Sequence, residues 1–141
     1  MSENALFFVG QKAFIEKDGE VLVLNGPYGL DFPGGRIQEG ETTDSNDRNE
    51  LISALKREVL EETNLEIEVF DPFFNWFQKA SIKSKNYGKT IYLVGFKCKY
   101  LSGELKLSDE HDNFQWVNKD NYKKLDNRGD YFLALEKYFS L

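Results

Sequence analysis

Two β-rich apolar runs open the chain, and segments that break regular structure follow them. The runs cover residues 6–16 and 20–25, and Lys17-Asp18-Gly19 between them predicts a hairpin turn. Glycine and proline then cluster in residues 26–35, and residues 39–49 contain no apolar side chain. The pattern predicts two paired strands and then a long loop.

A helical pattern follows this loop, over residues 50–63. Leu51, Ile52, Leu55 and Val59 fall on one stripe at helical spacing, and strong helix formers fill most other positions. We therefore predict an amphipathic helix that packs this stripe on the rest of the fold.

The second half of the chain alternates between β-rich and helical patterns. Strands are predicted at residues 65–70, 73–79, 90–101 and 113–117, a basic loop at 81–89, and helices at 119–125 and 131–138. Strands mixed with one dominant central helix indicate an α/β or α+β sandwich around a mixed sheet. A chain of 141 residues suits a single domain spanning residues 1–141.

Composition narrows the classes of function. The chain has 18 basic and 24 acidic residues, and a net charge of -6 argues against binding of polymeric DNA or RNA. A phosphate-bearing substrate would then need another source of positive charge, and a divalent cation is the simplest one.

The cysteine and histidine content also excludes some chemistry. Cys98 and His111 are the sole residues of their types, so an intramolecular disulfide and the usual Cys/His zinc cluster are both excluded. Cys98 alternates with Phe96 and Tyr100 on one strand face, which favours a core role. No apolar run is long enough to cross a bilayer, and we expect a cytoplasmic protein with no membrane partner.

Three glutamates gather on the predicted helix. Glu58, Glu61 and Glu62 stand at positions i, i+3 and i+4, so they project from one side. At about 100 degrees per residue, Glu62 falls between Leu51 and Leu55, at the edge of the apolar stripe. Buried like charges are costly unless a partner neutralises them, and oxygen ligands around Mg²⁺ provide that partner. An exposed acidic face in which Arg57 pairs with Glu61 is the alternative.

The glycine-rich segment upstream of the helix completes a recognisable pattern. Residues 34–41 read Gly-Gly-Arg-Ile-Gln-Glu-Gly-Glu, and residues 57–62 read Arg-Glu-Val-Leu-Glu-Glu. Together they resemble the Nudix box, G-x5-E-x7-R-E-U-x-E-E-x-G-U, where U is a bulky aliphatic residue. Gly35 and Glu41 match its first half, and Leu65 matches its last position. The resemblance implies a Nudix-like α/β/α sandwich around a central mixed β-sheet.

Two departures from the box stand out. Fifteen residues separate Glu41 from Arg57 where the pattern has seven, so we expect the extra residues to enlarge the loop before the helix. Asn64 stands where the box has glycine, and asparagine is the next best residue for the left-handed conformation that ends a helix.

The resemblance implies a metal-dependent hydrolase that cleaves the phosphoanhydride bond of a nucleoside diphosphate linked to another moiety, such as a nucleoside triphosphate or a nucleotide sugar. Mg²⁺ or Mn²⁺ would be the cofactor, with Glu58 and Glu62 as the main ligands and the Gly34 carbonyl as a further one. Glu61 would be an additional ligand or a water-positioning base. The implied substrate-binding residues are Gly35, Arg36 and Glu41. Arg57 would orient the glutamates. The aromatic residues Phe73, Phe74, Trp76 and Phe77 are expected to lie mostly in the core and partly in the surface of a homodimer, with stacking on a base as the alternative.

A general base outside the box is also expected. The acidic loop Ser108-Asp109-Glu110-His111-Asp112 precedes a predicted strand and resembles the loop that supplies the base in many relatives. Glu110 is the candidate base, whereas a lone histidine such as His111 is more often structural.

Three alternatives stay open at this point. A catalytically silent Nudix-fold module that binds a nucleotide is disfavoured by the full set of glutamates. An isopentenyl diphosphate isomerase is disfavoured by the intact box and by the core-like Cys98. The third is a structural protein with an acidic helix, for which a divalent metal would have no effect.

Overall fold

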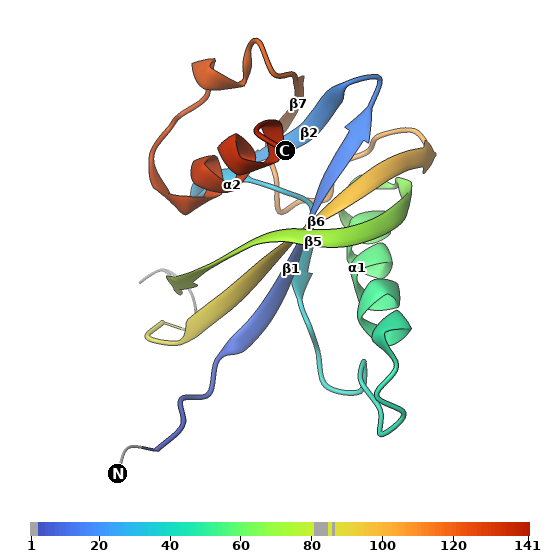
Figure 1. Ribbon diagram of the computed structural model, residues 1–141, viewed down its shortest axis with the longest axis vertical. Coiled ribbons are helices and arrows are strands. Elements are labelled where there is room, and N and C mark those ends of the chain that lie inside the picture. Colours follow the sequence, from blue (N-terminus) through green and yellow to red (C-terminus); the bar gives the residue numbers. More distant parts are fainter. Residues whose placement is uncertain (1–2, 81–84, 86) are drawn as a thin grey trace.

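A mixed β-sheet lies at the centre of the molecule, and one helix covers each of its faces (Figure 1). The computed structural model describes residues 3–80, 85 and 87–141. Its elements are β1 (Phe8–Lys17), β2 (Glu20–Gly26), β3 (Gly29–Asp31), β4 (Gly34–Arg36), α1 (Arg48–Thr63), β5 (Glu66–Lys79), β6 (Thr90–Ser102), β7 (Asn113–Val117), the 3-10 helix η1 (Tyr122–Lys124) and α2 (Gly129–Phe139).

The strands run in the order β3-β2-β1-β6-β5, with β4 paired to β1 and β7 paired to β2. The β1–β6 pair is parallel, and the other pairs are antiparallel. The loop after β3 returns the chain to β1, which places the start of β4 beside Lys12. The centre of β1 therefore lies beside the glycine-rich segment in the sheet.

Side chains alternate across β1 and β2 and form two cores. Phe14 of β1 and Val23 of β2 point to the face covered by α2, where the core includes Leu135. Ile15 and its neighbours point to the opposite face of the sheet, where they pack with Leu55, Val59, Phe96 and Cys98 under α1. An α/β/α sandwich with a mixed sheet is thus confirmed, and Cys98 is a buried core thiol.

The hairpin predicted between the first two strands is confirmed. Lys17 pairs with Glu20, and the two residues between them, Asp18 and Gly19, have φ of 52° and 79°. Positive φ at both central positions is the geometry that matches the twist of a two-residue hairpin.

Helix α1 begins earlier than predicted, at Arg48. The Asp47 side chain accepts a hydrogen bond from the Asn49 amide and caps the helix, so the last residues of the polar loop join it. Asn64 ends the helix at φ 65°, and its amide donates to the Leu60 carbonyl. Asparagine therefore takes the left-handed position that glycine holds in the Nudix box.

The polar loop before α1 is ordered by one carboxylate. Glu50 accepts hydrogen bonds from the Thr43 amide and hydroxyl, both at 2.6 Å, and from the Ser45 hydroxyl. These contacts fold residues 42–47 back on the first turn of the helix. The longer spacing in the box is thus absorbed by a compact turn.

Some predicted elements were wrong in detail. The strands expected at residues 65–70 and 73–79 are one strand, β5, whose register shifts on both sides of Pro72. A proline is tolerated because β5 is an edge strand and the shifts absorb its missing amide donor. The helix expected at 119–125 is the short η1, and β3 and β4 were missed because each has three residues. The predicted basic loop lies partly outside the described residues.

The described helices are too short or too polar to span a membrane.

The cap at Asn64 yields a stability prediction. An alanine at this φ meets the left-handed penalty of about 1–2 kcal/mol, whereas glycine does not. We expect Asn64→Ala to have a free energy of unfolding about 1 kcal/mol below that of Asn64→Gly, as measured by urea denaturation. Equal stability of the two variants would show that the cap conformation is not strained.

Candidate active site

Helix α1 presents Glu58 and Glu62 to the glycine-rich turn of β4. Glu62 is 6% exposed, and its Oε2 accepts a long hydrogen bond of 3.4 Å from the Gly34 amide. Burial raises the pKa of Glu62 to about 7, although Lys12 and His111 attract its charged form. A buried carboxylate with so weak a partner is suited to bind a cation.

Two glycines allow the turn to lie this close to both the sheet and the helix. Gly34 has φ 141°, and a Cβ there would lie 2.0 Å from the Gln11 carbonyl oxygen. At Gly35 a Cβ would lie 2.7 Å from the Glu58 carboxyl carbon. The turn is held in place by the Ala13 amide, which donates to the Pro33 carbonyl at 2.7 Å. A larger residue at Gly34 would push the turn away from the β1 backbone, whereas one at Gly35 would displace the Glu58 carboxylate.

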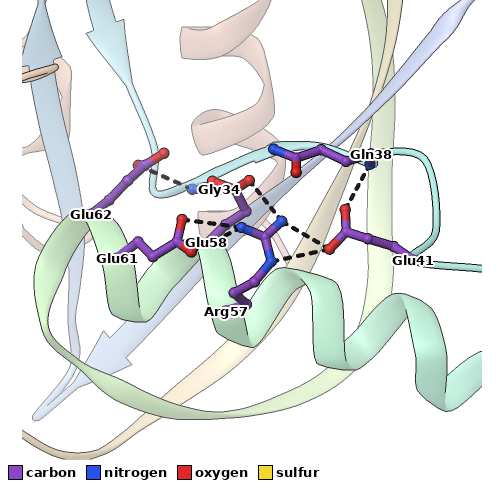
Figure 2. Close-up of polar contacts among 7 residues, drawn as sticks. All are labelled: Gly34, Gln38, Glu41, Arg57, Glu58, Glu61 and Glu62. Atoms are coloured by element: carbon purple, nitrogen blue, oxygen red, sulfur yellow. Dashed lines mark hydrogen bonds and ion pairs between the residues drawn. The ribbon is translucent and has the colours of Figure 1, made fainter.

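Arg57 joins three carboxylates behind this turn (Figure 2). Its Nη2 donates to Glu41 Oε2 at 2.8 Å and to Glu58 Oε1 at 3.0 Å, and its Nη1 donates to both oxygens of Glu61. Glu41 also accepts from the Gln38 amide at 2.6 Å. The pair of Glu41 with Arg57 therefore forms despite the longer spacing between them.

A polar cavity of about 590 Å³ opens in front of the turn. Among the residues singled out from the sequence, its lining includes Gly34, Gly35, Arg36, Glu58, Glu62 and Glu110. Glu41, Arg57 and Glu61 lie outside the lining and form the network behind it. The lining also includes uncharged side chains, namely Tyr28, Leu30, Gln78 and Tyr131.

Sequence reasoning missed an ionic chain on the floor of the cavity. Asp31 Oδ1 lies 2.9 Å from Lys12 Nζ, and Asp31 Oδ2 lies 2.9 Å from His111 Nε2. Burial acts to raise the pKa of Asp31, but Lys12, His111 and the Phe32 amide outweigh it and lower the pKa to about 2. The hydrogen bond to Asp31 raises the pKa of His111. The floor thus carries a fixed carboxylate between the Lys12 ammonium group and the His111 ring.

Part of this chain had a signal in the sequence. Lys12 is a lone charge inside the apolar run of β1, and a lysine that is 9% exposed needs a partner. The partner of Lys12 could not be identified, because Asp31 lies on another strand, β3, and meets Lys12 only in the folded protein.

The oxygen atoms at the turn fit a hard divalent cation. No group of three or more His, Cys, Asp or Glu side chains in the described residues is arranged to hold a metal by itself. Mg²⁺ does not require one, because it is usually bound by one or two carboxylates together with substrate phosphates and waters. Glu58, Glu62 and the Gly34 carbonyl could supply such a set.

The fold and the site define a class of protein, and the sequence comparison agrees with it. The chain matches the NUDIX domain over residues 13–135, which is most of its length. The chain therefore belongs to the Nudix hydrolase family, which cleaves nucleoside diphosphates linked to another moiety.

Solved structures of Nudix proteins share the fold. The MutT protein from Methanosarcina mazei Go1 matches with a TM-score of 0.74 and 23% identity, over 99% of this chain and 96% of that one. A Nudix hydrolase from Nitrosomonas europaea matches at 0.71 and 22%, over 96% and 90%. An ADP-ribose pyrophosphatase from Streptococcus suis 89-1591 matches at 0.57 and 20%, over 81% and 75%. No curated protein matches the sequence.

The ionic chain on the cavity floor predicts a pH-dependent stability. Asp31 has a pKa of about 2 against an ordinary value of 3.8, so its carboxylate stabilises the fold above about pH 4 and loses this effect as the pH falls. We expect Asp31→Asn to lower the free energy of unfolding by about 2 kcal/mol at pH 7, and by progressively less towards pH 2.

Urea denaturation followed by tryptophan fluorescence measures this difference at each pH. Asp126→Asn is the matched control, because Asp126 pairs with Arg128 on the surface and its loss should leave stability unchanged. If Asp31→Asn lowers the free energy of unfolding by the same amount at pH 7 and at pH 2, the lowered pKa of Asp31 is contradicted.

Proposed function

We propose that this protein is a divalent-metal-dependent pyrophosphohydrolase that acts on a nucleoside triphosphate or a nucleotide sugar. The observation that supports this best is the approach of Glu58 and Glu62 to the Gly34–Gly35 turn at one end of a polar cavity. We further propose that residues 1–141 act as a single domain. We also propose a cytoplasmic location, which the free thiol of Cys98 fits.

The metal ligands in this proposal are oxygen atoms around the turn. Glu58, Glu62 and the Gly34 carbonyl would hold Mg²⁺ or Mn²⁺. Glu61 would be an additional ligand, although in this structure Arg57 pairs with it outside the cavity lining. Such an ion would neutralise the diphosphate and polarise the oxygens around the reacting phosphorus. This explains how a chain of net charge -6 binds a polyanion.

The side chains divide the remaining work. Arg57 donates to the neighbouring Glu58 carboxylate and fixes it, and Glu41 in turn fixes Arg57. Glu110 accepts a proton from the water that attacks phosphorus, while the bond from phosphorus to the bridging oxygen breaks. Gly35 and Arg36 contact the phosphate chain from the turn.

The uncharged part of the cavity lining suits the nucleoside. Tyr28, Leu30 and Gln78 belong to it, and the Tyr28 ring is exposed, whereas the Tyr131 ring packs against Phe32 and Trp76. Ring faces and an amide bind a planar base by stacking and hydrogen bonding. A small nucleotide is thus the proposed binding partner.

A homodimer is also part of the proposal. It is supported by Phe77, which is 59% exposed on the edge strand β5.

The test is phosphate or pyrophosphate release from a panel of nucleoside triphosphates, nucleotide sugars, ADP-ribose and dinucleoside polyphosphates. We expect turnover that requires Mg²⁺ or Mn²⁺ and that falls about a hundredfold or more in Glu62→Gln. Glu68→Gln is the control, because Glu68 is an exposed carboxylate on β5 outside the cavity.

Other outcomes are equally informative. Tight nucleotide binding without turnover on any compound would replace the hydrolase by a silent binding module. Turnover that does not require a divalent metal would exclude the proposed metal-binding role of the α1 glutamates. Turnover that survives in Glu62→Gln would exclude this role for Glu62.

A further inference from the structure

The loop that carries Glu110 is fixed to the rest of the site by two backbone hydrogen bonds. The Ser108 amide donates to the carbonyl of Glu62 at 3.0 Å, and the Asp112 amide donates to the Asn25 carbonyl at 2.9 Å. Glu110 lies between these two anchors and is exposed. Its position therefore depends on what holds the middle of the loop.

His111 holds the middle of the loop. It is 9% exposed, and its Nε2 lies 2.9 Å from Asp31 Oδ2. Because a carboxylate of lowered pKa only accepts hydrogen bonds, Nε2 is the donor. The Nδ1 atom is buried and has no partner among the described residues, so Asp31 is the one polar anchor of this ring in that part of the chain.

Backbone packing leaves little freedom around the ring. A Cβ on Gly26 would lie 3.3 Å from both the Glu110 carbonyl oxygen and the His111 ring. The loop thus rests against β2 at this glycine. A sideways shift of His111 would carry the Glu110 backbone with it.

Asp31 is itself fixed at the other end of this chain of contacts. Its Oδ1 lies 2.9 Å from Lys12 Nζ and accepts from the Phe32 amide at 2.8 Å. Lys12 also donates to the Phe32 carbonyl at 3.3 Å. Asp31 stands just before the Phe32-Pro33 segment that leads into the Gly34 turn. A side chain on β3 therefore links the acidic loop to the turn and to β1.

We propose that Asp31 and His111 are positioning residues that hold the Glu110 loop in register with the Gly34–Gly35 turn. This inference rests on the proposed role of Glu110 as the base. A base must lie within hydrogen-bond reach of the proton it removes, and a displacement of about 1 Å can cost a hundredfold in rate. The Lys12-Asp31-His111 chain sets that distance without touching the reacting atoms.

Amide hydrogen exchange of the full chain, without metal or nucleotide, tests the tether directly. We expect His111→Ala to accelerate exchange at Ser108 and Asp112 about tenfold, because a hydrogen bond to a charged group is lost. Exchange at Asn64, whose amide caps α1, should stay unchanged. His111→Gln keeps a donor for Asp31 and should stay within about threefold of the wild type. Asp109→Asn is the control in the same loop.

Kinetics then test whether the tether acts through Glu110. We expect His111→Ala to lower kcat about tenfold with KM within about twofold, and to cause no further loss in a Glu110→Gln background. Unchanged loop exchange, faster exchange throughout the molecule, or additive losses in the double variant would each overturn the proposal. If the wild type has no turnover, the proposed function fails, while the exchange result still decides whether the tether exists.

Discussion

The site depends on a close approach that only glycine permits. At Gly34 the space for a Cβ is taken by the Gln11 carbonyl of β1, and at Gly35 it is taken by the Glu58 carboxyl group of α1. At Gly34 the turn therefore has no room for a side chain, and at Gly35 a side chain would displace the Glu58 carboxylate. In this position the Gly34 amide donates to the buried Glu62 carboxylate, and both residues line the cavity.

The charges around this turn are arranged in two layers with different tasks. Behind the turn, Arg57 ties Glu41, Glu58 and Glu61 together outside the cavity lining. In front of it, Glu62 is buried with one long hydrogen bond, and burial raises its pKa to about 7. The helix thus keeps one carboxylate poorly neutralised, which is costly for a protein without a cation and favourable for one that binds a cation.

Local patterns in the sequence predicted those parts whose partners are near in the chain. The spacing of Glu58 and Glu62 on α1, the hairpin at Asp18 and the left-handed cap at Asn64 all follow from short-range geometry. The Lys12-Asp31-His111 chain does not, because its members come from three distant segments and meet only when β1, β3 and the acidic loop assemble. The continuity of β5 through Pro72 was missed for the same reason: it depends on edge pairing with β6.

Anomalous diffraction from crystals of the full chain with Mn²⁺ and a methylene-bridged nucleotide analogue tests the central claim most directly. The account predicts a manganese peak about 2.2 Å from carboxylate oxygens of Glu58 and Glu62, facing the Gly34 carbonyl. The same crystals of Glu62→Gln should lose or weaken that peak. A bound analogue with no manganese at the turn, or with manganese held elsewhere, would contradict the account.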